Sequence, residues 1–136
     1  MRCKELLALA EWGNFCALSH LTFPLRFISG DFGGHEVDML RYAAVIDKIF
    51  DIIISKDIAL EVNSSGIRKG LHVPMPSPEY IKRYRDKGGQ LITVGSDAHR
   101  VSDVGANIPE CLAMLKKIGY TNICVFSRKT PTFIKI

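Results

Sequence analysis

Two side chains that can bind a metal ion stand two residues apart at the end of an apolar run. Asp97 and His99 follow the segment Leu91–Val94 after one glycine and one serine. In an extended chain, residues two apart point to the same side, so this carboxylate and imidazole can ligate one metal ion or two neighbouring ones. The alternative is that both residues only end a strand or cap a turn. The D-x-H pattern therefore indicates a metal site only together with other residues.

Polar residues also end two other apolar runs. His20 follows "FCALS", and Asn63 ends "IALEVN". In parallel α/β architectures the active site lies at the carboxyl ends of the strands, so His20, Asn63, Asp97 and His99 are predicted to share one edge. A lone histidine such as His20 is, however, more often a core residue bonded to a backbone carbonyl than a metal ligand.

A third stretch has the composition of an anion site. The segment "NSSGIRKG", residues 63–70, offers two hydroxyls, a glycine turn and then Arg68 and Lys69. Backbone N–H groups near such a turn, beside a guanidinium, can hold a phosphate. Arg26, six residues after His20, can reach the same edge of the strands. The plainer interpretation is an exposed basic loop.

The other acidic and histidine candidates are weaker. Glu61 lies inside an apolar run and needs a partner if it is buried, which either an ion pair or a catalytic role would supply. His35 and His72 lie in segments rich in glycine and proline, where solvent exposure is expected.

The elements that must position these residues alternate between helix and strand. Helical periodicity or capping signals predict helices at 3–12, 36–55, 77–88 and 107–118. Short apolar runs predict strands at 15–20, 58–63, 91–96 and 122–126. Residues 64–78, with two glycines and three prolines, are expected to hold no long regular element. The order contains no hairpin signal, so it predicts an α/β fold of parallel strands with helical crossovers, forming one domain over residues 1–136.

Composition excludes several classes of protein. The 136 residues are 47% hydrophobic and 24% charged, which is typical of a soluble globular domain. The basic residues are scattered and lack the interleaved aromatic residues of a nucleic-acid groove, and charges interrupt every apolar stretch that might span a membrane. The four cysteines form no C-x-x-C pair and no signal peptide is recognisable, so a reducing, cytoplasmic location is expected.

Four segments together resemble one known family. The stretches "LSHLTFPLRF" (18–27), "ALEVNSSGIRKG" (59–70) and "GGQLITVGSDAHR" (88–100), with "VG" at 104–105, resemble the C-terminal half of the histidinol-phosphatases of the PHP family. The order and spacing also match, over essentially the whole chain. The resemblance implies half of a distorted (β/α)7 TIM-like barrel and the metal-dependent hydrolysis of L-histidinol phosphate to L-histidinol and phosphate in histidine biosynthesis.

The resemblance also implies roles for particular residues. His20, Asp97 and His99 match metal-ligand motifs of a cluster of two or three zinc, manganese or iron ions, with Asp97 and His99 catalytic. Arg26 and Arg68 are the candidates for holding the substrate phosphate. The family pattern opens with an H-x-H motif that this chain does not contain, so we expect an N-terminally truncated domain that self-associates or is completed by a separate N-terminal half.

Three alternatives remain open from the sequence. In the first, the chain is a PHP phosphoesterase with another phosphorylated substrate. In the second, it is a non-catalytic remnant that acts as an interaction or oligomerising module. In the third, it is a small α/β binding module in which D-x-H is only a turn. The last alternative predicts that Asp97→Ala and His99→Ala leave metal and ligand binding unchanged.

Overall fold

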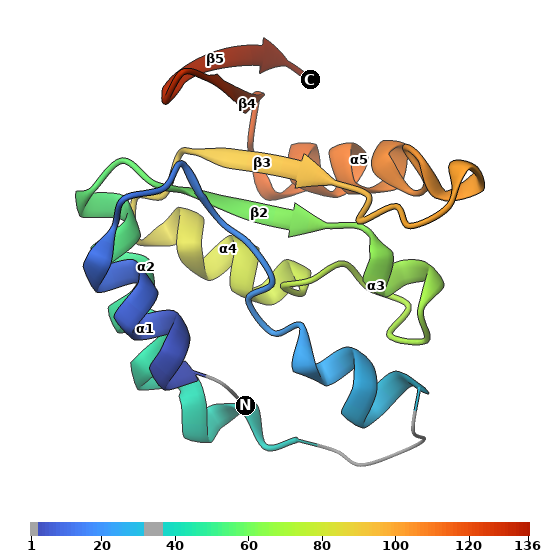
Figure 1. Ribbon diagram of the computed structural model, residues 1–136, viewed down its shortest axis with the longest axis horizontal. Helices are drawn as coiled ribbons and strands as arrows, with labels where there is room; N and C mark the ends of the chain where they lie inside the picture. The colour runs from blue at the N-terminus through green and yellow to red at the C-terminus, as the bar shows by residue number, and fades with distance from the viewer. Residues whose placement is uncertain (1–2, 32–36) are drawn as a thin grey trace.

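The computed structural model describes residues 3–31 and 37–136 and places a parallel sheet against a layer of helices (Figure 1). Its strands are β1 (Ala17–Leu18), β2 (Ala59–Asn63) and β3 (Ile92–Gly95), in the order β1-β2-β3 and all parallel. The α-helices are α1 (Cys3–Trp12), α2 (Ala43–Ser55), α3 (Ser65–Arg68), α4 (Pro78–Asp86) and α5 (Ile108–Ile118). This mixed α/β architecture with helical crossovers is the one that the sequence predicts.

Three further helical segments lie in the connections. They are a π-helical turn η1 (Arg26–Asp31) and two 3-10 turns, η2 (Met39–Tyr42) and η3 (Val101–Asp103). The predicted helix 36–55 begins at Glu36, which lies outside the described residues. Its visible part starts as η2, where the side chain of Asp38 accepts a hydrogen bond from Leu40 N at 3.1 Å, and becomes α-helical at Ala43.

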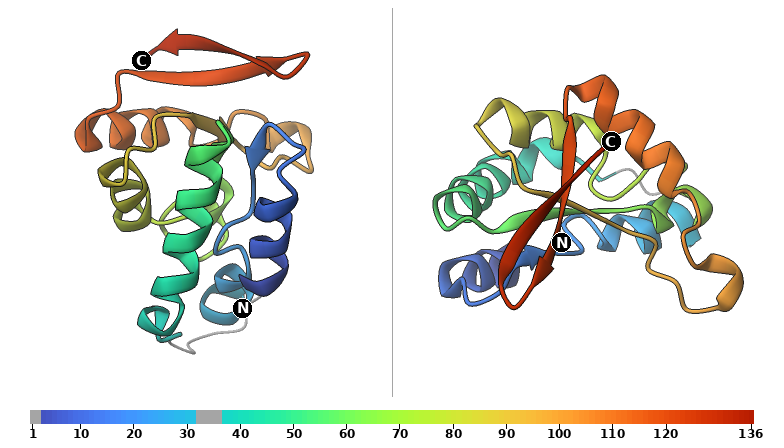
Figure 2. Two further views of the ribbon diagram at one scale, coloured as in Figure 1. Left: turned by 90° about the vertical axis from the view of Figure 1, so that its left-hand side faces the viewer. Right: turned by 90° about the horizontal axis from the view of Figure 1, so that it is seen from above.

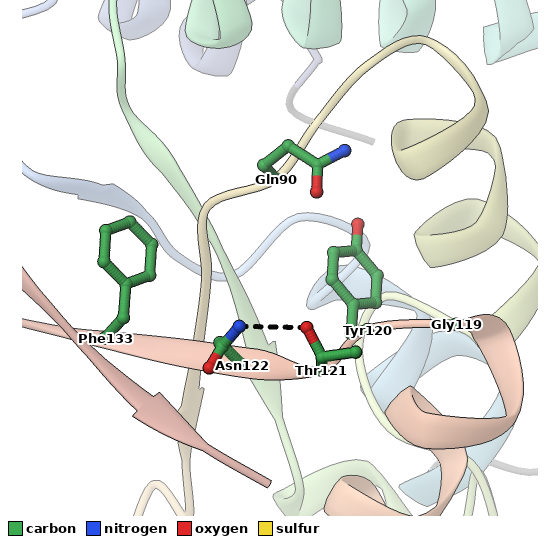
Figure 3. Close-up of a pocket in the computed structure, with 6 residues that line it drawn as sticks. All are labelled: Gln90, Gly119, Tyr120, Thr121, Asn122 and Phe133. Carbon is green, nitrogen blue, oxygen red and sulfur yellow. Dashed lines mark hydrogen bonds between the residues drawn. The ribbon is translucent and has the colours of Figure 1, made fainter.

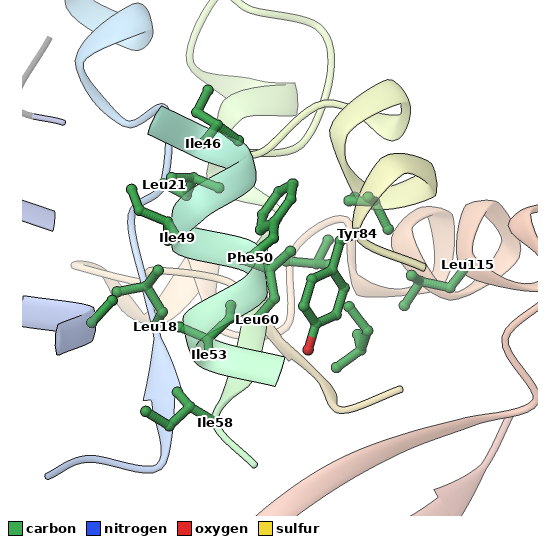
Figure 4. Packing of buried hydrophobic residues seen from close by; sticks show 14 of the residues in the cluster. Leu18, Leu21, Ile46, Ile49, Phe50, Ile53, Ile58, Leu60, Tyr84 and Leu115 are labelled. Atoms are coloured by element: carbon green, nitrogen blue, oxygen red, sulfur yellow. The ribbon is translucent and has the colours of Figure 1, made fainter. Parts of the chain in front are cut away.

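The helix α2 illustrates why these segments fold as they do. Its side chains Ile46, Ile49, Phe50 and Ile53 recur at helical spacing and are all fully buried. They pack against Leu18 and Leu60 of the sheet and against Tyr84 of α4 (Figure 4). The ring of Phe50 meets that of Tyr84 edge to face, with centroids 5.3 Å apart, so one stripe of α2 joins the sheet to the helical layer.

The two faces of the sheet have different chemistry. In the parallel register Leu60 pairs with Ile92 and Val62 with Val94, and this face packs into the core beneath α2, α4 and α5, which lie on one side of the strands (Figure 2, right). Successive residues of a strand point to opposite sides. The other face therefore carries Ala59, Glu61 and Asn63 of β2 with Thr93 and Gly95 of β3.

The end of the chain corrects the predicted topology. Strand β4 (Asn122–Ser127) pairs antiparallel with β5 (Thr130–Lys135) in a separate two-stranded sheet, so both the parallel fourth strand and the absence of hairpins were wrong predictions. The turn residues Arg128 and Lys129 have φ values of 49° and 64°. This left-handed pair matches a type I′ hairpin turn, whose usual signal is Asn-Gly or Asp-Gly, and an Arg-Lys pair gives no such signal.

Residues 64–78, where no long regular element was expected, contain one short helix. Ser65–Arg68 form the short helix α3 directly after β2. The side-chain oxygen of Asn63 accepts a hydrogen bond from Ser65 N at 2.9 Å, so the strand residue itself turns the chain into the helix. Within the described residues, no helix is both long and apolar enough to cross a membrane.

Candidate active site

Asp97 is the centre of a polar cluster at the carboxyl end of β3. Its Oδ2 lies 3.6 Å from Arg26 Nη1 and accepts a hydrogen bond from Ser65 Oγ at 3.5 Å. The side chains of Arg26 and Asp97 are only 15% and 17% exposed, so water screens their attraction less than it screens a surface ion pair. Asp97 also has a left-handed backbone with φ of 50°, a conformation that is uncommon for residues other than glycine and that is concentrated at functional sites.

Arg68 approaches the same strand end from α3. Its Nη2 donates hydrogen bonds to the carbonyl oxygens of Ser96, at 2.7 Å, and of Asp97, at 3.3 Å. Its Nε faces Asp103 Oδ2 at 3.5 Å, while Nη1 is buried and has no hydrogen-bond partner among the described residues. The guanidinium is thus fixed beside Asp97, and its Nη1 can still donate a hydrogen bond.

His99 is held by one ring nitrogen and exposes the rest of its ring. Its Nδ1 lies 2.9 Å from the carbonyl oxygen of Asp97, and its side chain is 80% exposed. With the ring hydrogen on Nδ1, that contact is a hydrogen bond and Nε2 carries a lone pair. Metal-ligating histidines are typically oriented in this way by a backbone carbonyl, so the donor set of Asp97 and His99 fits a metal ion.

His20 lies at the edge of this cluster. It is exposed, has a left-handed φ of 61°, and stacks on the ring of Phe23 with centroids 4.6 Å apart. Arg26 covers the same Phe23 ring at 4.7 Å, so His20 is linked to Asp97 through two intervening side chains. His20 and Phe23 also line a shallow pocket with Leu6 and Pro24.

The predicted metal ligands are not assembled into one centre. Over residues 3–31 and 37–136, no group of three or more His, Cys, Asp or Glu side chains is placed to hold a metal ion. Arg26 and Arg68 both lie beside Asp97, whereas His20, which was predicted to share one edge with Asp97 and His99, does not join them in such a group. The assignment of these residues to catalysis, metal binding and phosphate binding stays a prediction.

Sequence reasoning missed two contributors to the cluster. Asp103, in η3, pairs with Arg68, and Phe23 supports both His20 and Arg26. The only available signal was the spacing of Asp103 after the D-x-H motif, which has no meaning without the loop geometry. His72 is exposed, as expected, and His35 lies outside the described residues.

A second pocket lies at the opposite end of β3. It is formed by Gln90, Gly119, Tyr120, Thr121, Asn122 and Phe133 (Figure 3). Its one ionisable side chain is Tyr120, whose pKa is raised mainly by burial and whose hydroxyl donates to the carbonyl oxygen of Gly89 at 2.9 Å. A buried, neutral and already bonded phenol makes this pocket a poor catalytic centre.

Known proteins share the sequence of this chain over nearly its whole length. A probable histidinol-phosphatase of Thermotoga maritima is 32% identical over 131 residues, and one of Clostridium acetobutylicum is 30% identical over 115 residues. These matches cover 95% and 84% of this chain. The chain is a relative of the histidinol-phosphatases.

The solved structure of one histidinol-phosphatase has the same fold over the matched part. The crystal structure of histidinol phosphate phosphatase from Lactococcus lactis, complexed with zinc, L-histidinol and phosphate, matches 96% of this chain with a TM-score of 0.70 and 17% identity. The chain spans about half the length of the curated histidinol-phosphatases, 52% and 44% for the two named above. No protein-family model matches the chain.

Proposed function

We propose that this chain forms the C-terminal half of a metal-dependent histidinol-phosphatase that hydrolyses L-histidinol phosphate to L-histidinol and phosphate. The convergence of Arg26 and Arg68 on Asp97 at the end of β3 carries this proposal. The similarity to histidinol-phosphatases supports it, as does the Lactococcus structure, which contains zinc, L-histidinol and phosphate.

The proposed architecture is half of a TIM-like (β/α)7 barrel, formed by a single domain of a cytoplasmic biosynthetic enzyme. In such a barrel the helices lie outside and the opposite face of each strand points inward. The helix-free face with Glu61, Asn63 and Thr93 would be the barrel interior. A further polypeptide segment, or a second chain, would supply the remaining strands and the remaining metal ligands.

The proposed metal ligands in this chain are His20, Asp97 and His99. His99 supports this assignment because its Nδ1 is already engaged by a backbone carbonyl, and Asp97 because its carboxylate attracts the Arg26 cation. Imidazole and carboxylate suit zinc, manganese and iron alike, and the proposed site holds two or three such ions. When bound, these metals would supply Lewis acidity and lower the pKa of a bound water.

The side chains of the chain itself would bind and orient the phosphate ester. Arg26 and Arg68 reach the same carboxyl end of β3 from different elements, so together they would form a positively charged site for a phosphate dianion. Guanidinium groups match phosphate oxygens with paired donors. The Arg26–Asp97 contact would then hold Arg26 in place before substrate arrives.

The test is metal content and phosphate release, measured on the 136-residue chain alone and mixed with the N-terminal half of the Thermotoga relative. We expect at least one metal per chain and phosphate release from histidinol phosphate in the mixture. Asp97→Ala should reduce the rate by more than the roughly ten- to hundredfold that loss of an outer-shell partner typically costs.

The matched control is Asp51→Ala, which removes an exposed carboxylate of α2 paired with Lys87 and should leave the rate unchanged. Equal metal content and equal rates for Asp97→Ala and the unmodified chain would contradict the proposal.

Exposed apolar side chains on the hairpin support a second candidate function, that of a non-catalytic interaction module. Val125 of β4 and Ile134 of β5 lie on the same face of the hairpin and are 47% and 45% exposed, and exposed apolar side chains that adjoin are typical of binding surfaces. This candidate predicts a stable oligomer without stoichiometric metal, which light scattering on the same preparation would detect.

A further inference from the structure

Glu61 is an acidic residue in the middle of a buried strand. Its neighbours Leu60 and Val62 belong to the core cluster beneath the helices. Because side chains alternate along a strand, Glu61 points to the helix-free face. It shares that face with Thr93, its register partner on β3.

The carboxylate of Glu61 leans toward the candidate active site. Glu61 is level with Thr93, but a Cβ added to Gly95 would lie only 3.0 Å from Glu61 Oε1. Gly95 is two residues closer than Thr93 to the carboxyl ends of the strands, a rise of about 6.6 Å. Asp97 follows Gly95 by two residues, so the missing side chain of Gly95 makes room for a carboxylate just beneath the Asp97 cluster.

Two buried polar atoms on this face lack hydrogen-bond partners. They are Glu61 Oε2, an acceptor, and Asn63 Nδ2, a donor, and neither is paired with any described residue. The other amide atom of Asn63, Oδ1, is occupied by Ser65 N. Leaving such atoms unpaired in a buried place is unfavourable by about 1–3 kcal/mol each, and by more for a charge. A ligand with both a donor and an acceptor would satisfy them together.

We propose that Glu61 and Asn63 form the subsite for the part of the substrate that carries the amine, with Glu61 Oε2 accepting from the protonated amine and Asn63 Nδ2 donating to an oxygen or unprotonated nitrogen of the same molecule. This inference rests on the proposed function, because an amino alcohol phosphate with an imidazole ring offers both kinds of group. The phosphate lies at the two arginines, and the amine end extends to Glu61.

The chemistry favours an amine over a metal ion at this position. A divalent cation needs several protein ligands, whereas Glu61 shares its face of the sheet with the neutral side chains of Asn63 and Thr93. A protonated amine needs one carboxylate and a few neutral acceptors. Glu61 has no described ion-pair partner, so its charge is free to select a cation.

The test measures binding rather than turnover, by calorimetry at pH 7 on the unmodified chain, Glu61→Gln and the control Glu79→Gln. The ligands are inorganic phosphate, L-histidinol and its des-amino analogue 3-(imidazol-4-yl)propan-1-ol. The unmodified chain and Glu79→Gln should bind L-histidinol about ten times more tightly than the analogue, since a hydrogen bond to a charged group is worth that much or more. Glu61→Gln should bind the two equally and keep its affinity for phosphate.

Two outcomes would overturn the inference. Equal affinity of the unmodified chain for histidinol and its analogue overturns it without any variant, so it remains testable even if Glu61→Gln fails to fold. Unchanged selectivity in a folded Glu61→Gln, for example because an ordered water alone pairs the two atoms, overturns it as well. Phosphate binding without histidinol binding removes only this inference, whereas binding of neither ligand also removes the proposed function for this chain.

Discussion

The layered part of the molecule and the terminal hairpin are stabilised in different ways. In the parallel sheet, Leu60 and Ile92 are fully buried against the helices, and the polar residues are confined to the opposite face and the strand ends. In the hairpin, β5 has no buried residue at all, and β4 buries only Cys124. Figure 2 shows the hairpin lying at one end, beyond α5. Packing stabilises the layered part, whereas the hairpin depends mainly on its own strand pairing.

Two side-chain hydrogen bonds attach the hairpin to the rest of the molecule. Cys124 Sγ donates to the carbonyl oxygen of Ile92 at 3.3 Å, and Lys129 Nζ donates to Asn14 Oδ1 at 2.6 Å. An isolated two-stranded hairpin is marginally stable in water at best. The comparison therefore indicates that the hairpin opens more easily than the layered part, which carries the candidate active site.

The largest expected difference comes from removing one aromatic ring from each region. Phe50→Ala should lower the free energy of unfolding by about 3–5 kcal/mol, because it empties a site between the sheet and two helices. Phe133→Ala removes the same ring from a position that is 57% exposed and should cost less than about 1 kcal/mol. Urea unfolding followed by circular dichroism measures both, and equal losses would remove the distinction between the regions.

A middle-sized effect is expected at the junction of the two regions. Tyr120, between α5 and β4, donates its buried hydroxyl to the carbonyl oxygen of Gly89 at 2.9 Å. Tyr120→Phe should lower the free energy of unfolding by about 1–2 kcal/mol, because it removes a buried hydrogen bond and leaves an acceptor unpaired. The control Tyr80→Phe removes a less buried hydroxyl of α4, and a larger loss there would contradict the assignment.

The hairpin turn offers a change that should strengthen the weaker region. Replacing Arg128 by Asn puts a residue that favours left-handed backbone where φ is 49° and keeps the Lys129–Asn14 hydrogen bond. Amide hydrogens of β4 and β5 should then exchange about fivefold more slowly, the equivalent of about 1 kcal/mol. Amides of β2 should be unaffected. Slower exchange in β2 as well would mean that hairpin and sheet unfold as one unit.

The smallest effect is expected on the surface of the helical layer. Arg83 Nε of α4 donates to Asp47 Oδ1 of α2 at 2.6 Å, and this hydrogen bond lowers the pKa of Asp47 from its usual value. Because the pKa is lower in the folded state, the stabilisation is present above the unfolded value of about 3.9 and is lost as the pH falls through the folded one.

Asp47→Asn should therefore cost less than about 1 kcal/mol at pH 7, since the pair is partly exposed, and nothing at the lowest pH at which the protein still folds. Unfolding curves at pH 7 and below pH 3 would measure this difference. A loss that is equal at both pH values would show that Asp47 acts through packing rather than charge.

Local sequence was sufficient for the layered part and insufficient for the hairpin. The stripe of α2 and the glycine cap of α5, where Gly119 has φ of 108°, follow from spacing and residue type, and the structure has both. The hairpin depends on a turn whose residues, Arg128 and Lys129, do not favour its conformation. The pairing of β4 with β5 overrides the local preference of these two residues, and neither residue type signals the turn.

The candidate active site was also predictable from the sequence only in part. That the segments following β1, β2 and β3 would approach one edge was predictable, because parallel strands bring their carboxyl ends together. The stacking of His20 on Phe23 and the pairing of Arg68 with Asp103 were not predictable. Both depend on loop conformations, and left-handed residues such as His20 and Asp97 have no signature in sequence.

The close approach of Glu61 to Gly95 also has an evolutionary consequence. A methyl group at residue 95 would press on the Glu61 carboxylate, and shortening Glu61 to aspartate would withdraw that carboxylate by one methylene. Gly95→Ala and Glu61→Asp should therefore each be harmful alone and less harmful together. In a library that varies both positions, the two should show positive epistasis.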